Sequence, residues 1–63
     1  MDQLLYGPEE GAKIIGIQRT TMFDLLRRGE IESVKLGRLR RIPRDALVAY
    51  VARLREEQRS NEH

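Results

Sequence analysis

The chain has 63 residues and a formal net charge of only +2, so we expect one small domain of marginal stability, because a domain of about 60 residues buries only about 60% of its unfolded surface. It has no Cys, and its only His, His63, is the last residue, which excludes disulfides and most small-domain metal chemistry, so neither a metal nor a cofactor is expected. The longest apolar run is far shorter than a membrane span of about 20 residues, and the first residues lack a signal-peptide pattern, so we expect a cytoplasmic protein with no membrane partner.

The first predicted helix covers residues 8–15. Pro8 suits the first position of a helix, and the two acidic residues that follow it complement the positive end of the helix dipole. Gly16 is a typical residue just past a helix C-terminus. Gly11 inside so short a helix should cost about 1 kcal/mol relative to Ala. We therefore interpret Gly11 as room for another helix to approach, and a tolerated weak spot is the alternative.

A second helix is predicted from residue 19 to residue 28. Met22, Leu25 and Leu26 fall at positions i, i+3 and i+4, and two arginines followed by a glycine end the pattern. Two short helices that meet at a tight, glycine-containing turn form the helix-turn-helix pattern, in which the second helix can enter the major groove of DNA. Short helical hairpins also occur in proteins that never bind nucleic acid, so this pattern alone does not decide the function.

The face of this helix opposite the apolar stripe should carry Thr20, Asp24 and Arg27. Arg27 could bind guanine or phosphate, but Arg27 and Arg28 also complement the helix dipole as ordinary C-terminal residues. Phosphate would repel Asp24, so we expect Asp24 to pair with one of these arginines. Phe23, at the edge of the apolar face, is expected in the core, and contact with the sugar-phosphate backbone is the alternative.

After residue 31 the hydrophobic period changes to an alternation that predicts a two-stranded hairpin around Gly37. Two registers are compatible with the sequence. A two-residue turn sets Leu36 opposite Leu39 and leaves Ile42 facing the other side. A three-residue loop instead pairs Val34 with Ile42 and places both on one face with Leu36. We favour this second register, in which Leu39 stands exposed at the tip.

Positive charge is concentrated around this hairpin. Residues 13–44 contain nine basic and three acidic residues, so the segment carries +6, whereas both flanking segments are mildly acidic, which is typical of a polyanion-binding surface. A twisted ribbon can bring its basic side chains to adjacent phosphates and insert its tip into a minor groove. These side chains are Lys35, Arg38, Arg40 and Arg41. Lysine and arginine also protect exposed sheet edges from aggregation, which is the alternative for Lys35 and Arg41.

A third helix is expected to open at Pro43 and to continue to about Leu54, because apolar residues recur there at amphipathic spacing. Within it, Leu47 and Val51 lie one turn apart and should seal the small core against the helical hairpin. Residues 4–6 are expected to add a short strand to the hairpin.

The sequence therefore predicts one domain over residues 1–54 and a polar, disordered tail over residues 55–63, where apolar periodicity is lost. We find no nucleophile with a partnered base, and the glutamates that are neighbours in sequence have side chains that diverge on a helix. We therefore expect no enzymatic activity and no catalytic residue.

Three segments in this order, PEEGAKIIGI, TTMFDLLRRGEI and VKLGRLRRIPRDAL, resemble the excisionase-type, MerR-like winged helix-turn-helix DNA-binding domains over about residues 4–54. The resemblance implies a mostly α-helical fold with a small β-hairpin wing. It also implies that residues 19–28 read the major groove and that the wing around Gly37 and Arg38 contacts DNA. The implied contacts are Arg19, Thr20, Thr21, Arg27, Lys35, Arg38 and Arg40. Phe23, Arg28 and Arg41 are further candidates.

Three residues depart from the family pattern. Gln18 stands where such domains often have a serine cap, and because glutamine caps poorly, the second helix is expected to start nearer Thr20 or Thr21. Gly11 stands where alanine is frequent. Asp24 stands where a basic residue is common, which leaves the base specificity open.

We interpret the chain as a sequence-specific, architectural DNA-binding protein. In this interpretation it is an excisionase, or recombination directionality factor, of a phage or mobile element, which bends double-stranded DNA and assists a site-specific integrase. The alternatives are a small MerR-like transcriptional regulator and a protein-interaction adaptor with the same fold. The apolar stripe of the last helix ends at Leu54, too early for a durable coiled coil, so we expect a monomer that occupies neighbouring DNA sites as adjacent copies.

Overall fold

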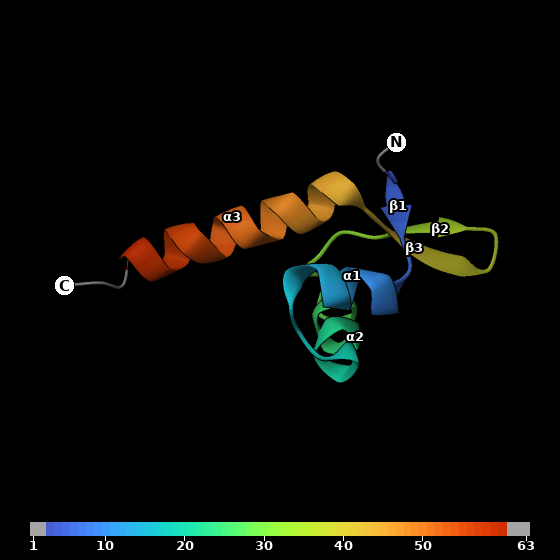
Figure 1. Ribbon diagram of the computed structural model, residues 1–63, viewed down its shortest axis with the longest axis horizontal. Coiled ribbons are helices and arrows are strands. Elements are labelled where there is room, and N and C mark those ends of the chain that lie inside the picture. The colour runs from blue at the N-terminus through green and yellow to red at the C-terminus, as the bar shows by residue number, and fades with distance from the viewer. Residues whose placement is uncertain (1–2, 61–63) are drawn as a thin grey trace.

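The computed structural model describes residues 3–60, which form three helices and a three-stranded antiparallel sheet (Figure 1). In chain order the elements are β1 (Leu5–Tyr6), α1 (Pro8–Ile15), α2 (Arg19–Arg27), β2 (Val34–Leu36), β3 (Leu39–Pro43) and α3 (Arg44–Ser60). The helices α1 and α2 pack together beneath the sheet, the β2–β3 hairpin projects to one side, and α3 runs away to the other. This is the winged helix-turn-helix architecture that the sequence predicts.

Helix α1 has the limits predicted from the sequence. At its start, the backbone N–H of Gly7 donates a hydrogen bond of 3.0 Å to a carboxylate oxygen of Glu10, one helical turn later. At its end, Gly16 adopts the left-handed conformation with φ of 82°, and its N–H donates to the carbonyl of Ala12 at 2.8 Å. Both ends are therefore determined by local chemistry.

Gly11 lies where three elements meet. A Cβ at this position would lie 3.2 Å from the Cδ1 atom of Ile42, 3.4 Å from the Cε atom of Met22 and 3.6 Å from the Cδ2 atom of Leu47. The predicted close approach is confirmed, and side chains from β3, α2 and α3 together make it.

Helix α2 begins at Arg19, so the prediction of a start nearer Thr20 or Thr21 is wrong. Gln18 makes no side-chain capping hydrogen bond, as expected of a poor cap, yet its carbonyl accepts the N–H of Met22 at 3.0 Å and closes the first turn. Met22 is fully buried. Its burial holds the first turn in helical form without a side-chain cap.

The sheet has the order β1-β3-β2, and the predicted short first strand is present as β1. The hairpin register is that of the two-residue turn, with Leu36 opposite Leu39, so the register that we favoured from the sequence is wrong. Strand β1 explains the difference, because it pairs Tyr6 with Ile42 and the Ile42 side chain is directed into the core. Gly37 has φ of 66°, which suits a tight turn at this position.

Helix α3 begins at Arg44, one residue after the predicted start, because Pro43 still pairs with Leu5 as the last residue of β3. Leu47 is buried as predicted, but Val51 is 38% exposed and does not seal the core. Tyr50 takes that place, because α3 turns its 46, 47 and 50 positions toward the sheet and the helical pair.

The structure also differs from the predicted disorder of residues 55–60, which continue α3 as far as Ser60. Arginine, glutamate and glutamine are good helix formers, and an ion pair of 3.2 Å joins Glu56 to Arg59 one turn later. The hydroxyl of Ser60 donates to the carbonyl of Glu56 at 3.0 Å. Residues 61–63 of the predicted tail lie outside the described residues.

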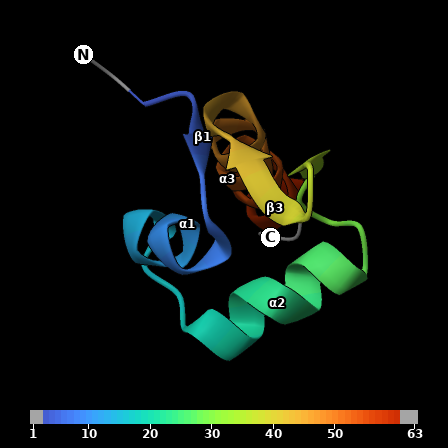
Figure 2. The ribbon, with the colours of Figure 1, turned by 90° about the vertical axis from the view of Figure 1, so that its right-hand side faces the viewer.

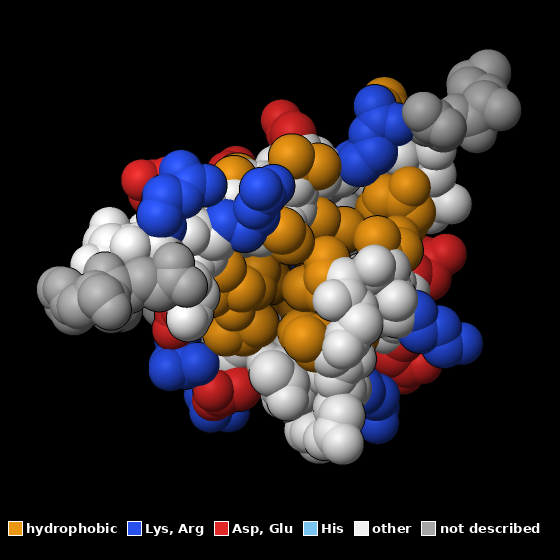
Figure 3. Space-filling view, turned by 60° about the vertical axis from the view of Figure 1, so that its left-hand side comes forward, with side chains coloured by type: hydrophobic (Ala, Val, Ile, Leu, Met, Phe, Trp, Pro, Cys, Tyr) orange, Lys and Arg blue, Asp and Glu red, His pale blue; other side chains and the backbone are white. Residues whose placement is uncertain are grey.

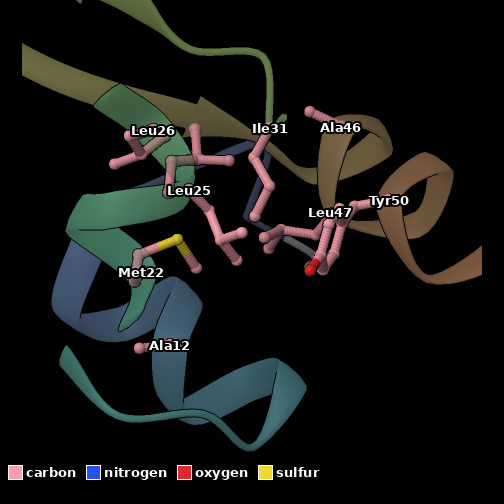
Figure 4. Close-up of a cluster of buried hydrophobic side chains, with 9 residues drawn as sticks. Ala12, Met22, Leu25, Leu26, Ile31, Ala46, Leu47 and Tyr50 are labelled. Atoms are coloured by element: carbon pink, nitrogen blue, oxygen red, sulfur yellow. The ribbon is translucent and has the colours of Figure 1, made fainter. Parts of the chain in front are cut away.

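The core lies where α1, α2, β3 and α3 converge (Figure 4). Its buried apolar residues are Ala12, Met22, Leu25, Leu26, Ile31, Ile42, Ala46, Leu47 and Tyr50. Arg53 fastens α3 to the segment that follows α2, because its guanidinium donates to the carbonyl of Glu30 at 2.5 Å and lies 5.6 Å from the centre of the Tyr50 ring. The buried core and this contact together fix the position of α2 relative to the sheet and α3.

Candidate nucleic-acid interface

Helix α2 and the β2–β3 hairpin stand out from the same part of the molecule. Figure 2 shows α2 along the lower border and β3 above it, with the turn end of the hairpin nearest the viewer, while α3 recedes behind the sheet. The side chains of Thr20, Thr21 and Arg27 are exposed on α2, and that of Asp24 is half-buried. The predicted outward direction of Thr20 and Arg27 is confirmed, and α2 presents a polar surface of the size that a major groove admits.

Asp24 pairs with both arginines at the end of α2, which confirms the pairing predicted from the i+3 and i+4 spacing. One carboxylate oxygen contacts Nη2 of Arg27, and the other lies 3.1 Å from Nε of Arg28. Arg28 is held a second time by Glu30, at 3.2 Å. Asp24 therefore orients two arginines while it cancels part of their charge.

The first turn of α2 contains a third charge-paired arginine, Arg19. Nε of Arg19 lies 2.8 Å from a carboxylate oxygen of Glu9 on α1. The guanidinium also lies 5.3 Å from the centre of the Phe23 ring. Phe23 is 42% exposed, so its predicted place in the core is wrong. One step of 100° from Met22 carries the ring off the buried face and onto the border of the exposed one.

The wing, defined as the β2–β3 hairpin with its turn, differs from α2 in how its basic side chains are paired. Lys35 and Arg40 are opposite one another in the register and hence share one face, and Arg38 occupies the turn between the strands. All three side chains are exposed, and within residues 3–60 none of them has an acidic partner. The arginines of α2 are thus charge-compensated, whereas these three wing cations are not.

Arg41 differs from the other wing cations. It is half-buried, its Nη1 donates to the carbonyl of Arg40 at 3.5 Å, and the same atom lies 2.9 Å from where a Cβ of Gly7 would stand. Its side chain is therefore folded against the chain that leads into α1. This position makes Arg41 a weaker candidate for a DNA contact than Lys35 or Arg40.

The sequence reasoning missed two features of this surface. The first is that Val34 and Leu36 share an exposed apolar face of the wing with Leu39, whereas the favoured register placed them on one face with Ile42. The glycine at the start of a two-residue turn was the available signal for it. The second is the ion pair between Glu9 and Arg19, which joins two helices and has no signature in the spacing along the chain.

Residues 3–60 contain no cluster of three or more His, Cys, Asp or Glu side chains with which a metal ion could be held. Among the same residues, no helix is long and apolar enough to cross a membrane.

Comparisons with known proteins agree with this geometry. A family model described as a helix-turn-helix domain matches residues 5–55. A curated protein of Saccharopolyspora erythraea named "Probable excisionase" is 51% identical over 57 residues, which cover 90% of this chain and 58% of that protein. The chain thus spans little more than half the length of this relative. No solved structure matches the chain significantly.

Proposed function

Because the chain belongs to the helix-turn-helix domain family, we propose that it binds double-stranded DNA sequence-specifically, with α2 in the major groove and the wing in the minor groove. The proposed contacts are Arg19, Thr20, Thr21 and Arg27 on α2 and Lys35, Arg38 and Arg40 on the wing, with Phe23, Arg28 and Arg41 as secondary contacts. The DNA-binding unit is proposed to span residues 1–54.

The observation that carries this proposal is the absence of acidic partners for the three wing cations within the described residues. Lys35, Arg38 and Arg40 gather on one short hairpin, which Figure 2 shows above α2. Cations that lie close together repel one another unless counterions or an anionic partner occupy the space between them. The regular negative charges of a DNA backbone supply such a partner, and release of the condensed counterions drives the binding.

We further propose that the chain acts as an excisionase, or recombination directionality factor, which bends DNA for a site-specific integrase. The 51% identity to a protein named "Probable excisionase" supports the proposal. One helix and one wing cover few base pairs, so adjacent copies and DNA shape would supply the remaining specificity. The exposed Leu36 and Leu39 beside the wing turn could partly unstack a base step and thereby favour a bend.

A MerR-like transcriptional regulator is the second candidate, and the length of α3 favours it. This helix has 17 residues and continues beyond the end that the sequence predicted, so it offers more length for pairing with a second copy. The residues added beyond Leu54 are all polar or charged, however, and a durable coiled coil needs about three or four heptads with an apolar seam.

Two measurements separate the two candidates. Fluorescence transfer between dyes at the two ends of a DNA fragment should rise as the protein is added, and sedimentation should report a monomer at micromolar concentration in the absence of DNA. A stable dimer that binds a palindrome and leaves the DNA straight would favour the regulator. No binding at physiological salt would reject both and leave the protein-interaction adaptor.

A further inference from the structure

A groove lies between β1, α1 and α3, and no residue of α2 or of the wing lines it. It encloses about 470 Å³ and is lined mainly by Tyr6, Ile14, Ile15, Leu47, Val48 and Val51. Figure 3 shows an apolar surface on this side of the molecule, with both basic and acidic side chains around its border. The groove belongs to a different part of the molecule from the proposed DNA-binding surface.

Several apolar side chains that line the groove are exposed to solvent. Ile14 is 55% exposed and Val48 is 64% exposed, and Val51 completes the same surface. Single exposed aliphatic side chains are ordinary, but a contiguous group around a concave surface is typical of a protein interaction site. Val51 also lines a second hollow, which continues along α3 past Leu54. The exposed surface is thus elongated along the axis of α3.

The charged side chains that line this groove have one sign. Among residues 3–60, Arg44 and Arg55 line it, and no acidic residue does. Arg55 has no acidic partner among residues 3–60. A second copy that packed the same face against this groove would bring arginine toward arginine in a partly desolvated contact, which costs free energy. The exposed apolar face of the wing is no better as an occupant, because its neighbours are also basic.

These observations favour a partner of opposite charge. We propose that the groove receives an amphipathic helix of another protein, which presents two or three aliphatic side chains to Ile14, Val48 and Val51 and a carboxylate to Arg55. Helices that dock into grooves are read through such anchors at i, i+3 or i+4 and i+7. Since the lining shares no residue with α2 or the wing, the protein could hold DNA and this partner at the same time.

The test uses two synthetic helical peptides of about 16 residues with the same leucine stripe, one flanked by Glu and the other by Lys. Methyl NMR spectra of the full chain should show shifts of Ile14, Val48 and Val51 with the Glu peptide. That peptide should bind about tenfold or more tightly than the Lys peptide. Equal affinities, or shifts confined to the wing, would overturn the proposal.

Charge reversal provides the matched comparison. Arg55→Glu should weaken binding of the Glu peptide and strengthen binding of the Lys peptide. Lys13→Glu makes the same change of charge on α1 outside the groove lining and should change the affinity for neither peptide. DNA binding is measured in the same samples and should persist in Arg55→Glu, so failure of the groove and failure of the proposed DNA function remain distinguishable. If Lys13→Glu reversed the preference as strongly as Arg55→Glu, the net charge alone would explain it and the site would be refuted.

Discussion

The guanidinium of Arg19 at the start of α2 lies 2.8 Å from the carboxylate of Glu9 on α1. Both side chains are about two-thirds exposed, so solvent screens the pair, and such pairs contribute at most about 1 kcal/mol to stability. The contact is therefore weak enough for a phosphate to replace Glu9 as the partner of Arg19. Glu9 thus competes with phosphate for an arginine that is proposed to contact DNA.

The first prediction follows from this competition. Glu9→Gln should strengthen DNA binding by about two- to fivefold at low salt, because it frees Arg19 and removes a negative charge near the phosphates. Glu57→Gln is the control, since it makes the same charge change on the exposed surface of α3. Fluorescence anisotropy with a labelled duplex measures both, and an equal gain in the two variants would contradict the competition.

The second prediction concerns the wing. The logarithm of the affinity should fall linearly with the logarithm of salt concentration, with a slope of about −4 to −6 for roughly five or six phosphate contacts. Lys35→Ala and Arg40→Ala should each make the slope shallower by about 0.9. Arg59→Ala, on α3 and already paired with Glu56, should leave the slope unchanged. A slope near zero in the unmodified protein would rule out phosphate neutralisation as the source of affinity.

The third prediction distinguishes residues that contact bases from residues that contact only the DNA backbone. Thr20→Ala or Arg27→Ala should reduce the discrimination between target and unrelated DNA by about 1–3 kcal/mol if a base contact is lost. Arg38→Ala, in the wing turn, should weaken binding to all sequences alike. Competition titrations with target and random duplexes provide the measurement. If both α2 variants keep the original site preference, α2 does not read the bases.

The fourth prediction concerns the core. Leu47→Ala should lower the free energy of unfolding by about 2–5 kcal/mol, because Leu47 is buried among α1, α2 and the sheet. Val51→Ala removes a side chain from the exposed groove and should cost less than about 1 kcal/mol. Thermal unfolding followed by circular dichroism compares the two. Equal losses would show that Val51 contributes to the core as much as Leu47 does.

Much of the fold follows from local patterns along the chain. The proline and glycine at the two ends of α1, the i, i+3, i+4 stripe of α2 and the pairing of Asp24 with Arg27 and Arg28 all depend on residues within one or two helical turns. Helical geometry is regular, so spacing in sequence determines which of these side chains meet. The helix-turn-helix was evident from the sequence for the same reason. The basic hairpin was evident because apolar residues alternate along it and a glycine marks its turn.

Contacts between distant segments required the tertiary structure. The partner of Ile42 is Tyr6 on β1, and this pairing decides the hairpin register that the sequence left open between two forms. The direction in which α3 leaves the sheet buries Tyr50 and leaves Val51 in the groove. A one-residue change of register, or a rotation of one position around a helix, moves a side chain from the core to the surface while the pattern of apolar residues hardly changes. The sequence by itself thus determined the elements and their charges, and packing between distant elements decided which faces remain available to partners.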